Sequence, residues 1–509
     1  MMQAQQAQVA VVGGGPVGML VAAELAAYGV DTVLFEPKAR VSERPKATTL
    51  HARAVQCLAR RGHLPPAAAP AGAAGASPFH FAGLPGLVIT APENEPEPIL
   101  KCPQAELERR FEARARAAGA RILREHRVTD LVQDAEGVRI TAEGPQGPVL
   151  CSARYLVGAD GARSTVRELA GIASDTHPAT VSALMGAVTL ADPQALTEGW
   201  HRTPRGWIVA KRDQQGRTHL RTLNCAGAHG DRQLPLTLEE LREEVSWIAG
   251  RDVAMEGPRW LSRFSDFTRL ARTFRERRVF LVGDAAHVHF PIGGQGLSTG
   301  VLDALNLGWK LALAAHGGAG ADLLDTYDLE RRPAARRVID NTRAQLALMR
   351  PGSELDSLRG VFTSMLAGDR DHGRLSGMIS AQDTVFPGHT GCPSPHAGTF
   401  LPNAALRTQT GETDVIGLLQ DGRPLLLLLG EGGERYRDEA RGWEPVLHVV
   451  HALPTPEVPY EALLVRPDGY LAWVPGGDEL AAALSVYFAG NACTVAGTAV
   501  HAGTGARLS

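Results

Sequence analysis

The apolar positions near the N-terminus follow the order of a β-strand, a helix and a second β-strand. Short apolar, β-branched runs lie at residues 8–12 and 30–35. Between them, Ala22, Ala23 and Leu25 continue at helical spacing. Buried parallel strands are near-continuous apolar runs of this length, and the helices that cover them repeat every three to four residues. The pattern therefore predicts a βαβ unit at the start of the chain.

Two later apolar runs also end in a turn of glycine and polar residues. One run, at residues 155–158, precedes Asp160, and another, at residues 278–282, precedes Gly283-Asp284. In an open α/β sheet, ligands bind beyond the carboxyl ends of the strands. Turns from distant parts of the sequence can therefore surround one elongated ligand. A long apolar helix is expected from Gly296-Leu297, and its free N–H groups would face an anion or an electron-rich carbonyl.

The pattern of apolar and polar residues changes twice more along the chain. Alternating runs between residues 177 and 270 predict a sheet-rich module, with an amphipathic helix over 236–248. From about residue 386, short strands separated by turns, and a helix over 478–489, predict an appended α/β module. Residues 65–78 are mostly Ala, Pro and Gly, which predicts a linker.

The first turn, Gly13-x-Gly15-x-x-Gly18, has the spacing that a bound dinucleotide requires. Gly13 would permit the tight turn, Gly15 would let the backbone approach a pyrophosphate, and Gly18 would let helix and strand pack closely. Glu36 ends the second predicted strand, where it would accept hydrogen bonds from a ribose. We therefore expect dinucleotide binding; the alternative is a glycine turn in an ordinary α/β domain.

Composition narrows the choice of partners. The 509 residues carry a formal net charge of -3, which gives no basic excess for nucleic acid or an anionic membrane. The N-terminus lacks the basic and apolar regions of a secretory signal, and no apolar run reaches the roughly 18 residues of a membrane helix. The six cysteines form no CxxC pair, so neither a disulfide framework nor a zinc site is indicated. We expect a reduced, cytoplasmic protein without a metal, a membrane or a nucleic-acid partner.

Three ordered motifs resemble the class A FAD-dependent aromatic hydroxylases related to p-hydroxybenzoate hydroxylase. They are the first turn with Glu36, residues 155–164, and residues 283–297, which continue into 303–311. Within that group the chain is most similar to actinobacterial aromatic-polyketide hydroxylases of the anthracycline and angucycline pathways. The resemblance covers nearly the whole chain.

The resemblance implies an α/β fold, the p-hydroxybenzoate hydroxylase fold with a C-terminal addition. A Rossmann-like FAD-binding domain would comprise residues 1–72, 102–176 and 271–385. An inserted β-sheet domain that binds substrate would comprise 73–101 and 177–270. Residues 386–509 would form a thioredoxin-like domain without the redox cysteines, which suits the missing CxxC.

The resemblance also implies which residues hold the cofactor. Gly13, Gly15, Gly18 and Glu36 would bind the ADP half of FAD, Asp284 the ribityl or diphosphate region, and Gly296-Leu297 the isoalloxazine. The other expected FAD contacts are Pro16, Val17, Lys38, Lys46, Arg53, Gln104, Asp160, Pro291 and Gly294. Asp160, with Gly161 and Arg163, matches a motif linked to both FAD and NAD(P)H, although it could simply cap the helix that follows.

One position departs from the family pattern. The loop before the second helix often carries Pro-Arg-Ala, whereas this chain has Pro45-Lys46-Ala47. The ammonium of lysine is a compact charge, whereas the guanidinium of arginine can donate two parallel hydrogen bonds to one acceptor group. A contact of the second kind would then need Arg44 or Arg53.

The implied reaction is a monooxygenation that consumes NADPH or NADH. Reduced FAD would react with O2 to give a C4a-hydroperoxide, which hydroxylates a polycyclic aromatic polyketide. No residue is expected to act as a nucleophile, and His287, His289 and Arg221 are the candidates for a base that activates the phenol. The alternatives are Baeyer–Villiger or epoxidising oxygen transfer, a flavin reductase without oxygen insertion, and a nucleotide-binding module that is not an enzyme. Either a monomer or a homodimer is compatible with the sequence.

Overall fold

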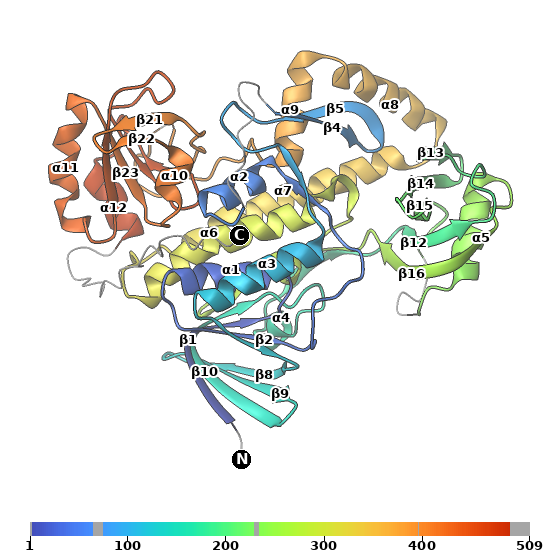
Figure 1. Cartoon of the computed structure of the whole chain (residues 1–509), viewed down its shortest axis with the longest axis horizontal. Coiled ribbons are helices and arrows are strands. Elements are labelled where there is room, and N and C mark those ends of the chain that lie inside the picture. Colours follow the sequence, from blue (N-terminus) through green and yellow to red (C-terminus); the bar gives the residue numbers. More distant parts are fainter. Residues whose placement is uncertain (1–2, 65–74, 229–233, 395, 489–509) are drawn as a thin grey trace, which may run out of the picture.

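A mixed β-sheet brings the three turns together at one edge (Figure 1). The computed structural model describes residues 3–64, 75–228, 234–394 and 396–488. The largest sheet of this described part has the order β18-β19-β10-β1-β2-β7, and β9 and β8 extend it from β10. Its strands are β1 (Gln3–Val12), β2 (Thr32–Glu36), β7 (Arg121–Arg124), β8 (Arg127–Gln133), β9 (Val138–Gly144), β10 (Gly147–Gly158), β18 (Arg275–Glu276) and β19 (Val279–Leu281).

The central strands of this sheet are parallel and in register at their carboxyl ends. Val12 of β1 lies opposite Gly158 of β10 and Phe35 of β2, and Gly158 lies opposite Leu281 of β19. The turns that follow β1, β10 and β19 are therefore neighbours. This is the arrangement that the apolar runs of the sequence predict.

Helices α1 (Pro16–Ala27), α3 (Gln104–Ala117) and α6 (Gly296–Ala315) cover one face of the sheet (Figure 1). The helix α1 begins after Gly15 with a proline in its first turn, where the missing N–H costs nothing. Both α1 and α6 are apolar around most of their circumference, and both are buried along nearly their whole length. Among the described helices, none is both long and apolar enough to cross a membrane.

A five-stranded antiparallel sheet forms the sheet-rich module that the alternating pattern of residues 177–270 predicts. Its order is β13-β14-β15-β12-β16. The helix expected over 236–248 forms as α5 (Leu238–Ala249), which packs its apolar side on one face of this sheet. The strands are β12 (Ser182–Leu190), β13 (Gly199–Thr203), β14 (Gly206–Arg212), β15 (Thr218–Asn224) and β16 (Met255–Ser265).

Smaller strands and helices connect this sheet to the first domain. The hairpin of β4 (Ala76–Phe81) and β5 (Leu84–Thr90) lies under α8 and α9 (Figure 1). The predicted linker is thus wrong from Ala76 onward, since that end is a strand; residues 65–74 lie outside the described residues. The remaining elements here are β3 (Thr49–His51), β6 (Ile99–Lys101), β11 (Ser174–His177), β17 (Thr268–Ala271), β20 (His287–Val288), α2 (Ala52–Arg60), α4 (Thr165–Leu169), α7 (Asp325–Met349), α8 (Ser353–Leu366) and α9 (Asp369–Ser380).

The C-terminal part is a separate mixed sheet with its own apolar core. Its strand order is β22-β21-β24-β23-β25-β26, with β23 parallel to β24 and antiparallel to β25. The all-leucine strand β23 is buried at every position. The elements are β21 (Ala405–Thr408), β22 (Gly411–Asp414), α10 (Val415–Leu419), β23 (Leu425–Leu429), α11 (Glu434–Ala440), β24 (His448–Ala452), β25 (Ala462–Val465), β26 (Leu471–Trp473) and α12 (Leu480–Tyr487).

Candidate active site

The first glycine turn is closely packed on one side and open on the other. Gly13 has φ +107°, and a side-chain Cβ there would lie 2.4 Å from the carbonyl oxygen of Ala159, in the second turn. A Cβ on Gly18 would lie 1.9 Å from the oxygen of Gly13, so strand and helix can approach only without one. A Cβ on Gly15 would meet nothing within 4 Å. The open side at Gly15 is where a ligand can reach the start of α1.

Val17 joins the first turn to the third. A Cβ built on Gly283 would lie 3.3 Å from Val17 Cγ2, and one on Gly300 of α6 would lie 2.6 Å from the same atom. Only glycines at these two positions let β19 and α6 lie so close to α1. The three turns are thus in contact, as the sequence predicts.

Glu36 is held at the end of β2 by backbone donors. Gly14 N donates to Glu36 Oε2 over 2.6 Å, and Lys38 N donates to Oε1 over 3.0 Å. The residue is 8% exposed. A carboxylate has about four lone-pair sites, so acceptor capacity remains for a ribose hydroxyl.

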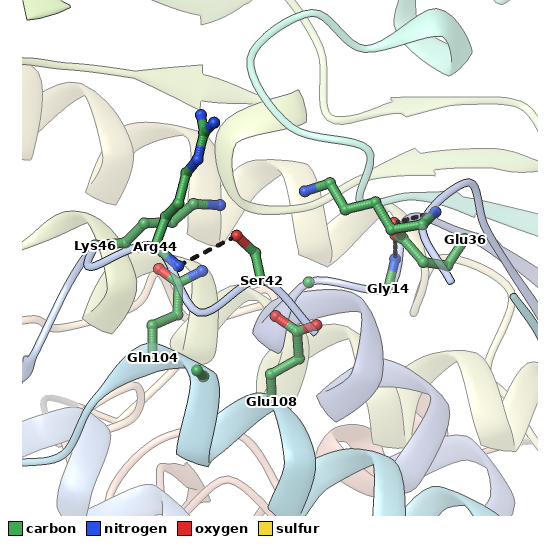
Figure 2. Close-up of a pocket in the computed structure, with 10 residues that line it drawn as sticks. Gly14, Glu36, Ser42, Arg44, Lys46, Gln104 and Glu108 are labelled. Atoms are coloured by element: carbon green, nitrogen blue, oxygen red, sulfur yellow. Dashed lines mark hydrogen bonds between the residues drawn. The ribbon is translucent and has the colours of Figure 1, made fainter. Parts of the chain in front are cut away.

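A pocket opens beside Glu36 (Figure 2), and polar side chains line it. Lys38, Arg44 and Lys46 bring three positive charges to it, and Gln104 reaches it from the start of α3. Lysine and arginine suit phosphate oxygens, and Arg44 supplies the forked guanidinium that Lys46 lacks. The pocket is lined by Gly14, Gly15, Glu36, Lys38, Ser42, Arg44, Lys46, Gln104, Ala105 and Glu108.

The structure places the Arg53 guanidinium against protein partners, and an FAD contact from this residue stays a prediction. Its guanidinium donates to Gln56 Oε1 over 2.8 Å and to the carbonyl of Gln382 over 2.9 Å. It also lies 3.5 Å from the ring centroid of Phe400. Arg53 lies on α2 and is buried against the segment that leads into the C-terminal sheet, from which Gln382 and Phe400, more than 300 residues away along the chain, contact it. It therefore joins two domains.

Asp284 follows β19 and faces open space. Its side chain is exposed, and among the described residues it has no hydrogen-bond or ion-pair partner. The surrounding protein raises the pKa of the Asp284 carboxyl by desolvation, whereas His287 and Lys46 lower it. This acid is therefore accessible yet surrounded by protein, as expected of a group that hydrogen-bonds to a ligand.

His287 is a structural residue, which corrects its candidacy as a base. Its Nε2 lies 2.7 Å from Asp303 Oδ2, which also accepts a hydrogen bond from Gly283 N over 3.0 Å. Arg331 Nε donates to the other oxygen of Asp303 over 2.8 Å. His287 is 1% exposed. The network fixes the turn that carries Asp284, engages Nε2 of His287 and keeps the ring buried.

The N-terminus of α6 lies at the end of a glycine turn. Gly293 and Gly294 have φ of +74° and +65°, and the N-cap residue Gln295 makes no side-chain capping hydrogen bond. Gln295 is anchored instead by Asn341 of α7, whose Nδ2 donates over 2.8 Å. Pro291 starts this turn and is exposed, and Leu297 is 8% exposed. The first turn of α6 can thus present its N–H groups to a ligand.

His51 of β3 positions this turn, a role that sequence reasoning missed. Its Nε2 lies 2.8 Å from the carbonyl oxygen of Gly293, and its backbone N donates to Ser298 Oγ over 3.0 Å. Burial lowers the pKa of His51 to about 4, so the ring is neutral at pH 7. No local pattern in Thr49-Leu50-His51 marks such a residue, because its partners lie more than 240 positions away.

His289 stays beside the start of α6. A Cβ on Gly296 would lie 3.4 Å from His289 Nε2, which has no partner among the described residues. Burial lowers the pKa of His289 to about 4. Its Nδ1 donates to the carbonyl of Phe290, so Nε2 of the neutral ring can accept one hydrogen bond but is a weak base at pH 7. No group of three or more metal-binding side chains occurs among the residues that the structure describes.

Asp160 caps the short helix after it. Its carboxylate accepts hydrogen bonds from Ser164 Oγ and from Val166 N, the latter over 3.0 Å. The side chain is partly exposed, and Arg163 beside it is exposed. A cofactor contact from Asp160 therefore stays a prediction, while its capping role is visible.

One face of the five-stranded sheet meets the loop that leads to α6. Phe264 of β16 packs on Phe290 with ring centroids 5.6 Å apart, and Leu223 of β15 lies in the same apolar cluster. Arg221 is two residues before Leu223 and so lies on the same face. This face is opposite the one that α5 covers. The sheet face that carries Arg221 therefore faces the glycine turn at Gly293.

Three cations gather between this face and the glycine turn. Lys101 Nζ donates to Thr49 Oγ1 over 2.8 Å, and Thr49 lies beside Gly294. Burial lowers the pKa of the Lys101 amine, and the charges of Lys211 and Arg221 lower it further. Burial also lowers the pKa of Arg221. Within the described ranges, Lys101, Lys211 and Arg221 pair with no carboxylate.

Most residues expected at the cofactor fit FAD. The turn at Gly15 is open where a pyrophosphate would approach, and Glu36 ends β2 where a ribose would lie. Asp284 is an unpaired acceptor at the end of β19, and the first turn of α6 is uncapped. These groups come from strands that end at one edge of the sheet, so one elongated molecule can touch them all.

Comparison with protein families gives two matches. Residues 6–342 match the FAD binding domain, and residues 394–490 match the C-terminal domain of aromatic-ring hydroxylases. Together the two matches account for most of the chain.

Individual proteins match over nearly their full length. The 12-dehydrotetracycline 5-monooxygenase/anhydrotetracycline 6-monooxygenase of Streptomyces rimosus is 35% identical, over 94% of this chain and 98% of that protein. The solved structure of CabE, an aromatic hydroxylase from angucycline biosynthesis, is 34% identical with a TM-score of 0.83, over 93% of this chain and 96% of that one. The dialkyldecalin synthase of Streptomyces rugosporus is 35% identical, over 94% and 98% of the two chains.

Proposed function

The chain belongs to the FAD-dependent aromatic-ring hydroxylases, and on this premise we propose that it hydroxylates a polycyclic aromatic polyketide with NAD(P)H and O2. Membership makes it a flavoprotein monooxygenase of the actinobacterial polyketide type. The substrate class, the use of a nicotinamide and the type of oxygen transfer belong to the proposal.

The observation that carries the proposal is the cationic, aromatic sheet face opposite the start of α6. Phe264 supplies a flat apolar contact on this face, where Trp207 is buried and Arg221 is exposed. A planar polycycle can stack there while its oxygens meet positive charge. The placement supports a large phenolic substrate between the sheet and the cofactor.

The residues at the sheet edge would hold the cofactor. Glu36 would bind the ribose, the start of α1 and the cations Arg44 and Lys46 would bind the diphosphate, and Asp284 would bind the hydroxyl-rich linker. The first turn of α6 would face the isoalloxazine, where its dipole favours added negative charge. When bound, the flavin supplies the reducing equivalents and the activation of O2.

The protein's own part in the reaction is to position and polarise the substrate. Positive charge beside a phenolic oxygen favours the phenolate, which makes the ring richer in electrons and a better acceptor of an electrophilic oxygen. Lys101, Lys211 and Arg221 are placed to do this. None of them needs to take up a proton, and His289, which is neutral, can contribute a hydrogen bond.

The nicotinamide would bind without a domain of its own. Among the described strands, the first turn is the one with the spacing of a dinucleotide fingerprint, and Gly317–Gly320 follows a helix. NAD(P)H would therefore bind transiently, without a dedicated domain to hold it.

The test uses the purified protein loaded with FAD and a panel of polycyclic phenols, including tetracyclic and angular ones. NADPH and NADH oxidation is followed with and without each phenol, and products are analysed by mass spectrometry and NMR. We expect a phenol that stimulates oxidation and gains one oxygen as a new hydroxyl group. A ring-expanded lactone or an epoxide would instead establish the alternative oxygen transfers.

Two other outcomes would overturn the proposal. Oxidation of NAD(P)H that never inserts oxygen into any phenol would indicate a reductase. A product of unchanged mass, formed without NAD(P)H, would indicate a cyclisation, as the similarity to dialkyldecalin synthase allows.

A further inference from the structure

Glu108 is a carboxyl group in the nucleotide pocket that no motif of the sequence marks. It lies on α3, one turn after Gln104, so both side chains share one side of the helix. Both line the pocket beside Glu36 and Gly15. Figure 2 shows Glu108 pointing from α3 toward the loop that carries Ser42.

Glu108 is buried but has no partner of its own. The residue is 9% exposed, and no described residue donates a hydrogen bond to its carboxyl group or pairs with it. Arg124 of β7 meets the carboxylate of Glu112 through Nε and one terminal nitrogen, and its other terminal nitrogen has no partner among the described residues. Its carboxyl group reaches the pocket, where a bound ligand can supply the hydrogen-bond partner that the protein does not.

The charges around Glu108 act in both directions. Burial is the main cause that raises the pKa of the Glu108 carboxyl to about 7, and the charge of Glu36 raises it as well. The charges of Arg124, Lys46 and Lys38 act in the opposite direction and lower this pKa. Arg44 also lines the pocket, and Glu112 lies one turn further along α3. Two carboxylates in one pocket repel each other, so ionising Glu108 beside Glu36 is unfavourable.

We propose that Glu108 is a binding residue for the nucleotide half of FAD, and that it binds as the neutral acid by donating a hydrogen bond. The nucleotide half offers acceptor oxygens and nitrogens and carries negative charge. An ionised Glu108 would be repelled by the phosphates, whereas the neutral acid both avoids this repulsion and gains a partner.

A consequence is that FAD binding takes up or retains a proton at Glu108. If the neutral acid is the form that binds, affinity is full below pH 7 and falls as Glu108 ionises in the free protein. By linkage, the dissociation constant should rise roughly tenfold per pH unit above about 7. The cofactor would then be retained at neutral pH and lost more readily in alkaline solution.

The test measures the dissociation constant of FAD between pH 6 and 9 for apoprotein prepared from the purified full chain. The fluorescence quenching of FAD reports binding, so the readout is independent of hydroxylation. For the wild type we expect the alkaline weakening described above. For Glu108→Gln, which is neutral and can donate at every pH, we expect an affinity close to the wild-type value at pH 6 and little change up to pH 9.

Glu106→Gln is the matched control on the same helix. Glu106 is about half exposed and pairs with Arg110 at the surface, so its loss should leave the wild-type pH profile intact. Circular dichroism and thermal unfolding of each apoprotein establish that the variants fold.

Three results would overturn the inference. The wild type could bind FAD equally well from pH 6 to 9, or Glu108→Gln could keep the alkaline weakening. A folded Glu108→Gln that binds FAD far more weakly than the wild type at pH 6 would mean that the ionised carboxylate is the binding form.

Discussion

Asp284 is the residue whose role follows most directly from its surroundings. It is an acid at a strand end, accessible, and without a partner among the residues described. A hydrogen bond between a charged group and a neutral one is worth about 1.5–3 kcal/mol, so Asp284→Asn should weaken FAD binding roughly 10- to 100-fold. Fluorescence titration of the apoprotein checks this. Glu256→Gln, at an exposed position of β16, should bind as the wild type does; equal affinities for Asp284→Asn and wild type would remove Asp284 from the cofactor site.

Arg221 is a second single residue with a testable role, which concerns the substrate and not the cofactor. Arg221→Met removes one of the unpaired cations, so the pKa of the bound phenol should rise. We expect KM for the phenol to increase about tenfold, which corresponds to a loss of roughly 1.4 kcal/mol of binding free energy. The acid limb of the kcat/KM profile should move to higher pH. FAD affinity should not change.

The conservative variant separates charge from packing. Arg221→Lys should restore part of the pH profile because it restores the charge, whereas the exposed Arg259→Met should leave the profile as it is. An unchanged acid limb in Arg221→Met would show that this residue does not act on the phenol.

Some site residues could be predicted from the sequence and others could not, for a physical reason. The glycines and Glu36 act through local geometry, the turn between β1 and α1, so their spacing is informative. His51, Lys101 and Glu108 act through neighbours distant in the chain. Arg53 and His287 are expected at the cofactor and in catalysis, and the structure adds protein partners, Phe400 and Asp303, that no local pattern indicates.

At the scale of elements, one buried network connects α6 to α7 and the C-terminal sheet. Glu330 of α7 lies 2.8 Å from Lys310 Nζ of α6, and it also accepts from both terminal nitrogens of Arg466, which precedes β26. His389 Nε2 is 2.8 Å from the same carboxylate. All four groups are buried, and the cations hold the pKa of Glu330 well below its usual range against the opposing effect of burial.

The two sides of this network should respond differently to substitution. Glu330→Gln removes the carboxylate that pairs with buried Lys310 and leaves Arg466 with Asp468 as its remaining partner, so it should lower the free energy of unfolding by about 3–5 kcal/mol at pH 7. Lys310 is different, because burial lowers its pKa to about 8, so Lys310→Met removes a costly charge while Arg466 still neutralises Glu330. We expect Lys310→Met to change the free energy of unfolding by no more than about 1 kcal/mol.

Chemical denaturation at several pH values checks both variants. Because the folded-state pKa of Glu330 is depressed, its stabilisation is present above the ordinary carboxyl pKa and is lost as the pH falls below it. The gap between wild type and Glu330→Gln should therefore narrow in acid. Equal destabilisation by the two substitutions would contradict this account of the network.

The elements themselves were largely predictable. Apolar runs marked β1, β10, β19 and β23, and helical spacing marked α5, because each pattern reflects one buried face. The start of β4 was missed because its Ala-Ser-Pro opening resembles the linker before it. The pairing of β4 with β5 compensates for that weak local preference.

At the scale of the whole molecule, the C-terminal domain completes the flavin domain. Arg60 donates to the carbonyl of Leu401, Arg61 donates to that of Leu419, and Arg466 pairs with Glu330. All three arginines are buried. A chain truncated after residue 385 would leave Arg60 and Arg61 short of acceptors and Glu330 short of Arg466.

We therefore expect the truncated chain to lack cooperative unfolding and to bind no FAD. Circular dichroism melting and fluorescence titration check this against the full chain. A truncated chain that unfolds cooperatively and binds FAD with unchanged affinity would show that the C-terminal domain is dispensable for the cofactor site.

The measurement that tests the central claim most directly is oxygen labelling of the product. The FAD-loaded protein is incubated under 18O2 with NAD(P)H and a polycyclic phenol that stimulates NAD(P)H oxidation. The mass of the product is then measured by mass spectrometry. The account predicts one labelled oxygen in the product for each NAD(P)H consumed in product formation, and none when the label is supplied as water. A product oxygen derived from water, or no labelled product with any phenol, would contradict it.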